Sequence, residues 1–318
     1  MSDKTKKKVI WTIVAIVVAI AAAISFLLGT RTSQTNLSAE RPAGKLGELA
    51  ISEMPQFFTI RPGLTFKIDT GSDASFITEE DLKTLDSLGF KATKSFYPLM
   101  SRDGIGDTRF TTERYTVSLP LYTWTSERDS LGNLQQSCNY DSFNILHNVD
   151  FQKSETGFST LGIDFLEKFK IIYLNRKKLL AIYFEDPMGF EVCAQMHTKL
   201  SISQYFSPGM RYYVDIAVDN DTNEYFLDTG VQRAFVKRPK NEHADYPDKS
   251  HNDSVESLRG KYPAIKDSAW VKIGNREGET IVYFYDNDEE KYALNPFNMF
   301  DLDIMLDFPN KQVKFRKS

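Results

Sequence analysis

Most of this 318-residue chain alternates between short apolar runs and clusters of turn-forming residues. Arg61-Pro62-Gly63 separates two apolar runs, Asn175–Lys178 forms a charged tip, and Asp219–Glu224 is rich in Asn and Asp. Apolar runs of about four to eight residues, bounded by turn residues, are typical of β-strands. Strands are therefore expected over Phe57–Ile60, Leu64–Ile68, Tyr115–Leu121, Ile171–Leu174, Leu179–Phe184, Tyr212–Val218 and Tyr225–Leu227.

Helical periodicity is sparse by comparison. Its best example is Thr78–Leu88, where Thr78 and Asp81 form a capping-box pattern and Gly89 follows as a C-terminal cap. A shorter helical turn is expected at Phe165–Phe169. The pattern therefore predicts a mostly β protein with one or two short helices.

The N-terminal segment differs from the rest of the chain. Val9–Gly29 contains no charged residue, and a helix of about 20 apolar residues spans the hydrocarbon core of a bilayer. Lysines between Lys4 and Lys8 precede it, and such residues mark the cytoplasmic side. The prediction is a single-pass membrane helix with a cytoplasmic N-terminus and the remaining chain in the periplasm or outside the cell. A cleaved signal peptide is the alternative, which the small residues Ala21–Ala23 leave open.

The remaining chain is expected to fold as two lobes. A polar stretch after Gly29 has the composition of a flexible tether, and the folded part is expected to begin near Leu46 or Ile51. The lobes are expected to divide near Pro187–Ser207. The predicted organisation is a basic cytoplasmic tail over residues 1–8, a transmembrane helix over 9–29, a tether over 30–50, an N-terminal lobe over 51–190 and a C-terminal lobe over 205–318.

The same motifs occur in the same order in both halves of the chain. Phe66–Ser72 carries an apolar run into Asp-Thr-Gly, and Tyr225–Val231 does the same. An apolar segment lies downstream of each copy, Leu161–Leu174 in the first and Leu294–Phe308 in the second. Because self-similarity over a long period is the signature of repeated structure, the two lobes are expected to be related.

Composition excludes several classes of function. A net charge of -4 gives no support for nucleic-acid binding, which calls for a basic face. The 4 His are scattered and there are only 2 Cys, so neither a metal site nor a cofactor is predicted. Cys138 and Cys193 can form a disulfide in an oxidising compartment or remain free thiols, and the sequence leaves both open.

The paired Asp-Thr-Gly turns carry the candidate chemistry. Facing turns would bring Asp69 and Asp228 into hydrogen-bond contact, where two like charges share one proton. The ionised carboxylate can then take a proton from a water that attacks an amide carbonyl, while the protonated one donates to the carbonyl oxygen. Supporting roles are expected for the threonines, which bridge the two turns, and for the glycines, which permit backbone angles that a side chain would forbid. These residues are Thr70, Gly71, Thr229 and Gly230.

These motifs resemble those of the aspartic proteases, especially the retropepsin-like branch. Leu161–Leu166 is similar to the family's apolar-Gly segment, which runs into a short helix. The resemblance implies a bilobal β fold of the retropepsin or pepsin type, with a peptide or protein substrate bound in an extended conformation under a Gly-rich flap. The flap candidate consists of Gly104, Ile105 and Gly106.

The second copy departs from the family pattern. Ser72 follows the first Gly and is expected to hydrogen-bond and tune Asp69, whereas Val231 at the matching position cannot do so. Leu294-Asn295-Pro296 replaces the apolar-Gly step, which puts the packing behind Asp228 in doubt.

The sequence therefore predicts a membrane-anchored aspartic endopeptidase whose active unit is one chain. A homodimer built from two first lobes is a competing arrangement. The alternative function is a catalytically inactive module of the same fold that binds peptides or partner proteins at the membrane surface.

Overall fold

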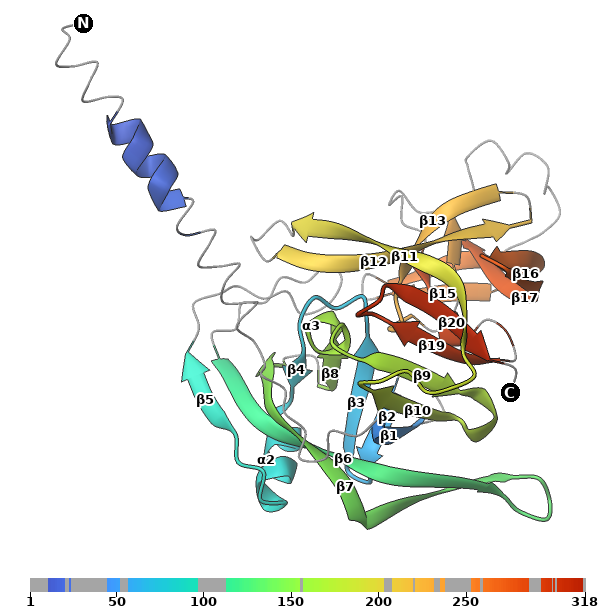
Figure 1. The fold of residues 1–318 in the computed structure, drawn as a ribbon, viewed down its shortest axis with the longest axis horizontal. Helices are drawn as coiled ribbons and strands as arrows, with labels where there is room; N and C mark the ends of the chain where they lie inside the picture. Colours follow the sequence, from blue (N-terminus) through green and yellow to red (C-terminus); the bar gives the residue numbers. More distant parts are fainter. Residues whose placement is uncertain are drawn as a thin grey trace, which may run out of the picture.

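The computed structural model describes residues 11–20, 23, 45–51, 57–96, 113–154, 157–202, 208–219, 221–231, 235–237, 253–257, 260–285, 293–298, 300 and 302–316. Strands dominate this part of the chain (Figure 1). The mostly β class predicted from the apolar pattern is therefore confirmed.

From Lys45 onward, the described residues of the first half form two α-helices and one 3-10 helix among the strands. Its elements are β1 (Lys45–Ile51), β2 (Phe57–Arg61), β3 (Leu64–Asp69), β4 (Phe76–Ile77), α2 (Glu79–Ser87), β5 (Thr93–Phe96), β6 (Glu113–Arg128), β7 (Leu134–Lys153), β8 (Ser159–Gly162), α3 (Ile163–Leu166), β9 (Lys170–Leu174), η1 (Asn175–Lys177) and β10 (Leu179–Tyr183).

The second half follows a similar order. Its elements are β11 (Glu191–Ile202), β12 (Pro208–Val218), β13 (Asp221–Leu227), β14 (Phe235–Lys237), β15 (Asp253–Ser257), β16 (Gly260–Ile273), β17 (Arg276–Tyr285), β18 (Ala293–Leu294), η3 (Pro296–Asn298), β19 (Asp303–Asp307) and β20 (Gln312–Arg316).

The strands that lead into the two Asp-Thr-Gly turns have matching neighbours. β3 pairs in parallel with β8, and β13 pairs in parallel with β18. β4 pairs antiparallel with β8 and parallel with β7, while β14 pairs antiparallel with β18 and parallel with β17. The duplication predicted from the order of motifs is thus present as a duplicated strand topology.

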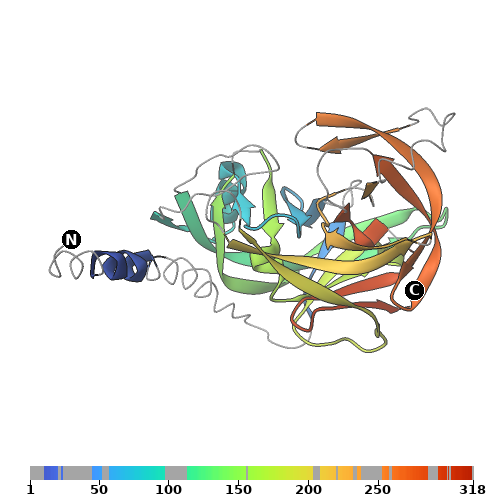
Figure 2. The same ribbon diagram turned by 90° about the horizontal axis from the view of Figure 1, so that it is seen from above.

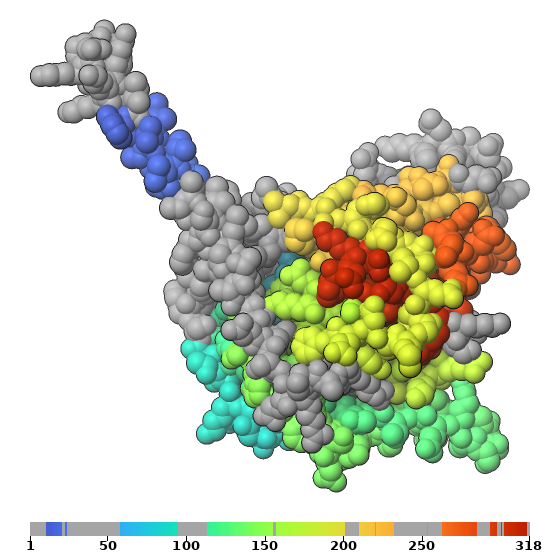
Figure 3. All heavy atoms as spheres, in the orientation of Figure 1, coloured from blue at the N-terminus to red at the C-terminus, as the bar shows by residue number. Residues whose placement is uncertain are grey.

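Six antiparallel strands, three from each half, join the two halves. Their order is β1-β10-β9-β19-β20-β11 (Figure 1). The halves meet at β9 and β19, where Ile304 lies opposite Tyr173 and Leu306 opposite Ile171. On the face seen in Figure 3, the red end of the chain is flanked by yellow and yellow-green segments, as this pairing requires. Figure 2 shows the cyan α2 region and the orange β16–β17 strands on opposite sides of the molecule.

One cluster of buried apolar side chains extends through both halves. Burying apolar surface against water is the main favourable contribution to folding, so a shared core holds the two halves together. The largest fully buried side chains include Phe58, Phe66, Phe151, Phe169, Tyr225, Phe308 and Phe315.

All of the strands expected from the apolar pattern are present. The turn at Pro62-Gly63 follows β2, and Gly63 has a φ of 81°, a left-handed conformation that favours glycine. The capped helix is present as α2, where Thr78 Oγ1 accepts the N–H of Asp81 at 3.1 Å. Gly89 follows with a φ of 90°, as its predicted C-terminal position requires.

Two local boundaries differ from the prediction. β13 already begins at Asp221, so the predicted Asp219–Glu224 turn is shorter, and Asp219 adopts a φ of 54° that Asp tolerates better than most residues. The short helix begins at Ile163 rather than Phe165, because the N–H of Glu167 bonds the carbonyl of Ile163.

The predicted domain borders also shift. The tether was expected to reach residue 50, but β1 begins at Lys45 and pairs with β10. This start agrees with the expectation that the folded part begins near Leu46, and the tether is correspondingly shorter. β11 fills the interval left between the two predicted lobes and pairs with β12 and β20, so it belongs with the second half.

Only part of the predicted membrane segment is described. Residues 11–20 and 23 are helical, and their side chains are exposed. Within the described part of the chain, none of the helices combines the length and apolarity that a bilayer crossing requires. The other residues of Val9–Gly29 lie outside the described residues, so the anchor remains a prediction.

Candidate active site

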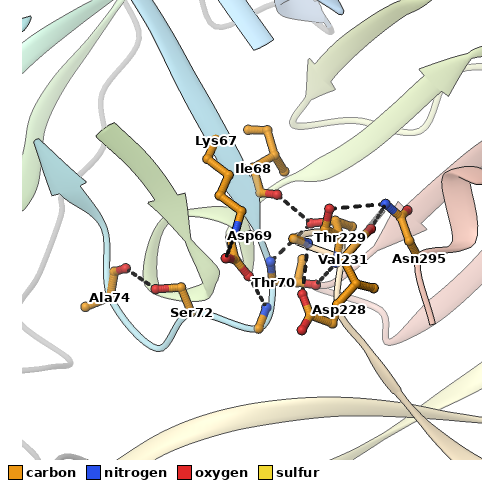
Figure 4. Close-up of polar contacts among 12 residues, drawn as sticks. Lys67, Ile68, Asp69, Thr70, Ser72, Ala74, Asp228, Thr229, Val231 and Asn295 are labelled. Carbon is orange, nitrogen blue, oxygen red and sulfur yellow. Dashed lines mark hydrogen bonds and ion pairs between the residues drawn. The ribbon is translucent and has the colours of Figure 1, made fainter. Parts of the chain in front are cut away.

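The two Asp-Thr-Gly turns meet where β3 and β13 end (Figure 4). The N–H of Thr70 donates to Thr229 Oγ1 at 3.1 Å, and the N–H of Thr229 donates to Thr70 Oγ1 at 3.0 Å. The Thr70 hydroxyl donates to the carbonyl of Leu227 at 2.6 Å, and the Thr229 hydroxyl to that of Ile68 at 3.0 Å. We call these four buried, reciprocal hydrogen bonds the threonine clasp. They join the two halves at the base of the site within one chain.

Gly71 and Gly230 each face the carboxyl group of the opposite turn. A Cβ atom on Gly71 would lie 2.6 Å from Asp228 Cγ, and one on Gly230 would lie 2.4 Å from Asp69 Cγ. Any side chain at either position would therefore push the opposite carboxyl away. Neither glycine has a positive φ. The expectation that these glycines adopt backbone angles forbidden to other residues is wrong. Glycine is needed at both positions because the opposite carboxyl fills the space that a Cβ would take.

Both aspartates are oriented by their own turns. The N–H of Gly71 donates to Asp69 Oδ1 at 3.0 Å, and the N–H of Gly230 donates to Asp228 Oδ1 at 2.8 Å. The second oxygen of Asp69, Oδ2, accepts a hydrogen bond from Lys67 Nζ at 2.7 Å. The side chain of Asp69 is 15% exposed, so solvent reaches the pair from its side.

The two carboxyls have opposite pKa shifts. Burial acts to raise the pKa of Asp69, but the charge of Lys67 and the hydrogen bonds to the carboxylate outweigh it, and the pKa lies below its usual value. Burial raises the pKa of Asp228, and the negative charge of Asp69 raises it further, to about 7. Because the two groups are coupled, they hold one shared proton over a wide pH range. That proton belongs mainly to Asp228.

Ser72 does not take the role expected for it. Its hydroxyl donates to the carbonyl of Ala74 at 2.8 Å and does not bond Asp69 (Figure 4). The side chain that does bond the Asp69 carboxylate is Lys67, whose Nζ donates to Oδ2. Sequence reasoning missed Lys67, although the signal was present: residues two apart in a strand share a face, and Lys67 stands two before Asp69.

The second half supports its turn by a different contact from the first. In the first half, Gly162 lies opposite Asp69 across the β3–β8 pair, and a Cβ there would meet the carbonyl oxygen of Ala74 at 2.3 Å. In the second half, the fully buried Asn295 follows the Leu227–Leu294 pair. Its Nδ2 donates to the carbonyls of Thr229 at 3.1 Å and Val231 at 2.7 Å.

Asn295 also fixes the segment that follows it. Its Oδ1 accepts the N–H of Phe297 at 3.0 Å, which anchors the start of η3. The N–H of Asp228 donates to the carbonyl of Leu294 at 3.0 Å. The doubt raised by the missing apolar-Gly step is therefore removed, because a buried amide supports this turn in place of close backbone packing. Val231 packs against the small apolar cluster of Ala264 and Tyr283.

Other sequence predictions lie outside this cluster. The flap candidate of Gly104, Ile105 and Gly106 falls outside the described residues. Cys138 and Cys193 are both free thiols in the structure, and Cys193 Sγ donates to the carbonyl of Ile273. In the part of the chain that the structure describes, no three His, Cys, Asp or Glu side chains are placed to hold a metal ion.

Comparison with known proteins gives matches among solved structures alone. No family model matches the chain, and no curated protein sequence matches it. Similar solved structures include conglutin gamma, a basic 7S globulin from lupine seeds, at 10% identity and a TM-score of 0.43 over 87% of this chain and 96% of that one. A structure named edgp is 11% identical with a TM-score of 0.47, over 87% and 95% of the two chains.

Basic 7S globulin from soybean is 12% identical with a TM-score of 0.38, over 80% of this chain and 89% of that one. Two of these proteins are named as globulins, and none is named as a peptidase. At identities of 10–12% and TM-scores of 0.38 to 0.47, these likenesses do not establish the activity of this chain.

The supporting role of Asn295 predicts that a glycine here, as at the matching position Gly162 of the first half, is harmful. Asn295→Gly removes two donated and one accepted hydrogen bond, and leaving buried polar groups unsatisfied costs about 1–3 kcal/mol each. Urea unfolding should show a clear loss of stability. Asn295→Asp, which keeps the shape but replaces the donor by an acceptor, should lose at least as much. Unchanged stability in both variants would refute this role.

The shifted pKa of Asp228 predicts a pH-dependent stability. Its folded-state pKa of about 7 lies above the ordinary value of 3.8, so the unfolded chain releases this proton first as pH rises. Between these values the folded state loses stability by about 1.4 kcal/mol per pH unit. Asp228→Asn removes that loss, so its Tm relative to the parent should rise from pH 4 to pH 8.

Two matched variants control this measurement. Asp141→Asn removes an exposed carboxyl and should show no such trend. Asp69→Asn leaves Lys67 without its carboxylate and should lower the Tm at neutral pH. An Asp228→Asn advantage that is the same at pH 4 and pH 8 would contradict the raised pKa.

Proposed function

We propose that this chain is an aspartic endopeptidase whose catalytic pair, Asp69 and Asp228, forms within a single chain. The observation that carries the proposal is the threonine clasp, which joins the two Asp-Thr-Gly turns and brings their carboxyls together. The opposite pKa shifts of these carboxyls supply a base and an acid at the same site. Pairs of titratable groups whose environments separate their pKa values in this way are typical of acid–base catalysts.

In the proposed reaction the two aspartates have different roles. Asp69 is ionised and takes a proton from a water molecule as that water attacks the carbonyl carbon of a peptide bond. Asp228 is protonated and donates to the carbonyl oxygen, which stabilises the tetrahedral intermediate. Activity should fall as Asp228 loses its proton near pH 7. The substrate class is a peptide or protein, and the active unit is one chain.

The second candidate is an inactive module of the same fold that binds peptides or proteins, and one contact favours it. Lys67 Nζ lies 2.7 Å from Asp69 Oδ2, and an ammonium group so close makes the carboxylate a weaker base. The same contact would also compete with a water molecule for that oxygen. Peptide binding without turnover is the outcome that this candidate predicts.

Matched substitutions distinguish the two candidates. Asp69→Asn and Asp228→Asn should each lower peptidase activity by several orders of magnitude, because each removes one member of a cooperative pair. The exposed Asp141→Asn serves as the control and should retain parental activity. Rates are measured on a broad peptide library from pH 3 to pH 8, with and without an inhibitor that carries a transition-state hydroxyl.

The outcomes separate three arrangements. Equal loss in both variants, at a specific activity independent of protein concentration, supports the single-chain pair. Loss in Asp69→Asn alone would indicate a homodimer of first lobes. Inhibitor binding by a parent that cleaves no peptide would favour the inactive module.

We also propose that the chain is anchored in a membrane through Val9–Gly29, with its N-terminus in the cytoplasm and the lobes on the opposite side. The charge-free segment and the preceding lysines support this proposal. Protease added to intact cells or spheroplasts should then digest the lobes. Digestion that occurs only after the membrane is lysed would refute this topology, and recovery of the lobes in the soluble fraction would indicate a cleaved signal peptide.

A further inference from the structure

Lys67 shares a strand face with the candidate catalytic residue Asp69. Along β3 the side chains alternate between buried and partly exposed positions, and Lys67 and Asp69 are both on the partly exposed face. Phe66 and Ile68 point to the other face, into the core. We call Asp69 and Asp228 the dyad. The alternation of the strand therefore places an ammonium group directly beside the dyad, as Figure 4 shows.

The contact between Lys67 and Asp69 is close and largely withdrawn from water. Lys67 Nζ lies 2.7 Å from Asp69 Oδ2, and the two side chains are 16% and 15% exposed. The same ammonium lies 5.9 Å from the centre of the Phe158 ring, which is within the range of a cation–π contact. A partly buried ion pair is screened by salt much less than an exposed one, so it acts strongly on the protonation of its carboxylate.

The dyad is asymmetric because of this contact. Each aspartate receives one backbone N–H from its own turn, so the two turns contribute equally. Position 226, which corresponds to Lys67 in the second half, is Phe226, and its ring lies 5.3 Å from the guanidinium of Arg211. The ammonium of Lys67 therefore lies on the Asp69 side of the dyad.

Charged groups on the neighbouring elements are engaged elsewhere. Asp164 of α3 accepts both the N–H and the hydroxyl of Ser75. Arg61 of β2 donates to the Tyr122 hydroxyl. β8 and β18 contribute no ionisable side chain. Among the described residues, Lys67 acts on Asp69 through its charge and a hydrogen bond, while the side chain of Asp228 and the N–H of Gly71 act through hydrogen bonds.

We propose that Lys67 is a positioning residue that divides the roles within the dyad: it holds Asp69 as the ionised partner and leaves the shared proton on Asp228. This inference rests on the proposed peptidase function and extends it. Without Lys67, the two carboxyls would compete for the proton on nearly equal terms. With it, the free protein already has the protonation state that water activation at Asp69 requires.

The proposal predicts the direction in which the pH profile of kcat/KM shifts when Lys67 is replaced. Lys67 lowers the pKa of Asp69 and also acts to lower that of Asp228. Removing its charge should therefore shift both limbs of the kcat/KM profile to higher pH. An opposite charge in contact shifts a carboxyl by about 1–3 units, so the acid limb of Lys67→Met should move by about that amount.

The kinetic experiment compares three variants of the full chain with the parent. Lys67→Met removes the charge at similar length, Lys67→Arg restores a cation and should restore the parental profile, and Lys83→Met removes an exposed lysine that pairs with Glu79. Lys83→Met should leave the profile unchanged. An unshifted profile in Lys67→Met would overturn the proposal. A general gain in activity without a shift would also overturn it, because Lys67 would then be an inhibitory contact.

A second measurement does not depend on activity. Carbon-13 NMR of labelled aspartate carboxyls follows the two groups directly, with Asp69→Asn and Asp228→Asn identifying the signals. In the parent, the titration step at lower pH should belong to Asp69. In Lys67→Met, both titration steps should move to higher pH. Equal titration in the parent and Lys67→Met would overturn the role of Lys67. Failure of the peptidase proposal would instead leave this titration result intact and appear as a parent without turnover.

Discussion

The site depends on the threonine clasp between the two halves of the chain. Thr70 and Thr229 each donate to a backbone carbonyl of the opposite strand and accept an N–H from the opposite turn. These bonds set the distance between β3 and β13, and that distance places each carboxyl against the glycine of the other turn. The coupling between Asp69 and Asp228 follows from it, because carboxyls held so close cannot both ionise easily. The six-stranded sheet and the shared core keep the two halves in this arrangement.

The duplicated halves support similar turns with different chemistry. Gly162 allows the backbone near Ala74 to approach closely, whereas Asn295 spans the corresponding space with hydrogen bonds from a buried amide. The contacts of the two carboxyls also differ, since Lys67 binds Asp69, Ser72 bonds the backbone, and Phe226 stands where the second half would carry the equivalent of Lys67. The two halves thus share a topology, while the surroundings of Asp69 and Asp228 are asymmetric.

The sequence allowed the fold class, most strands, helix α2 and the two facing turns to be predicted, because these depend on local periodicity and capping. Asn295 was interpreted as a weakness because its partners, Thr229 and Val231, lie far away in the sequence. Lys67 was missed because it lies within a segment that was interpreted as an apolar strand, although strand alternation places its side chain on the same face as that of Asp69. The pairing of β1 with β10 was not predictable, because the two strands are far apart in the sequence and their pairing depends on the backbone.

The central claim is that one chain supplies both members of a catalytic pair. The most direct measurement is a crystal structure of the protein with an inhibitor that carries a transition-state hydroxyl, in which the separation of the two carboxyls is measured. The account predicts that the inhibitor hydroxyl lies within hydrogen-bond distance, about 3 Å, of both Asp69 and Asp228 of the same chain. Carboxyls contributed by two different chains, or an inhibitor bound away from an Asp69 that remains paired with Lys67, would contradict it.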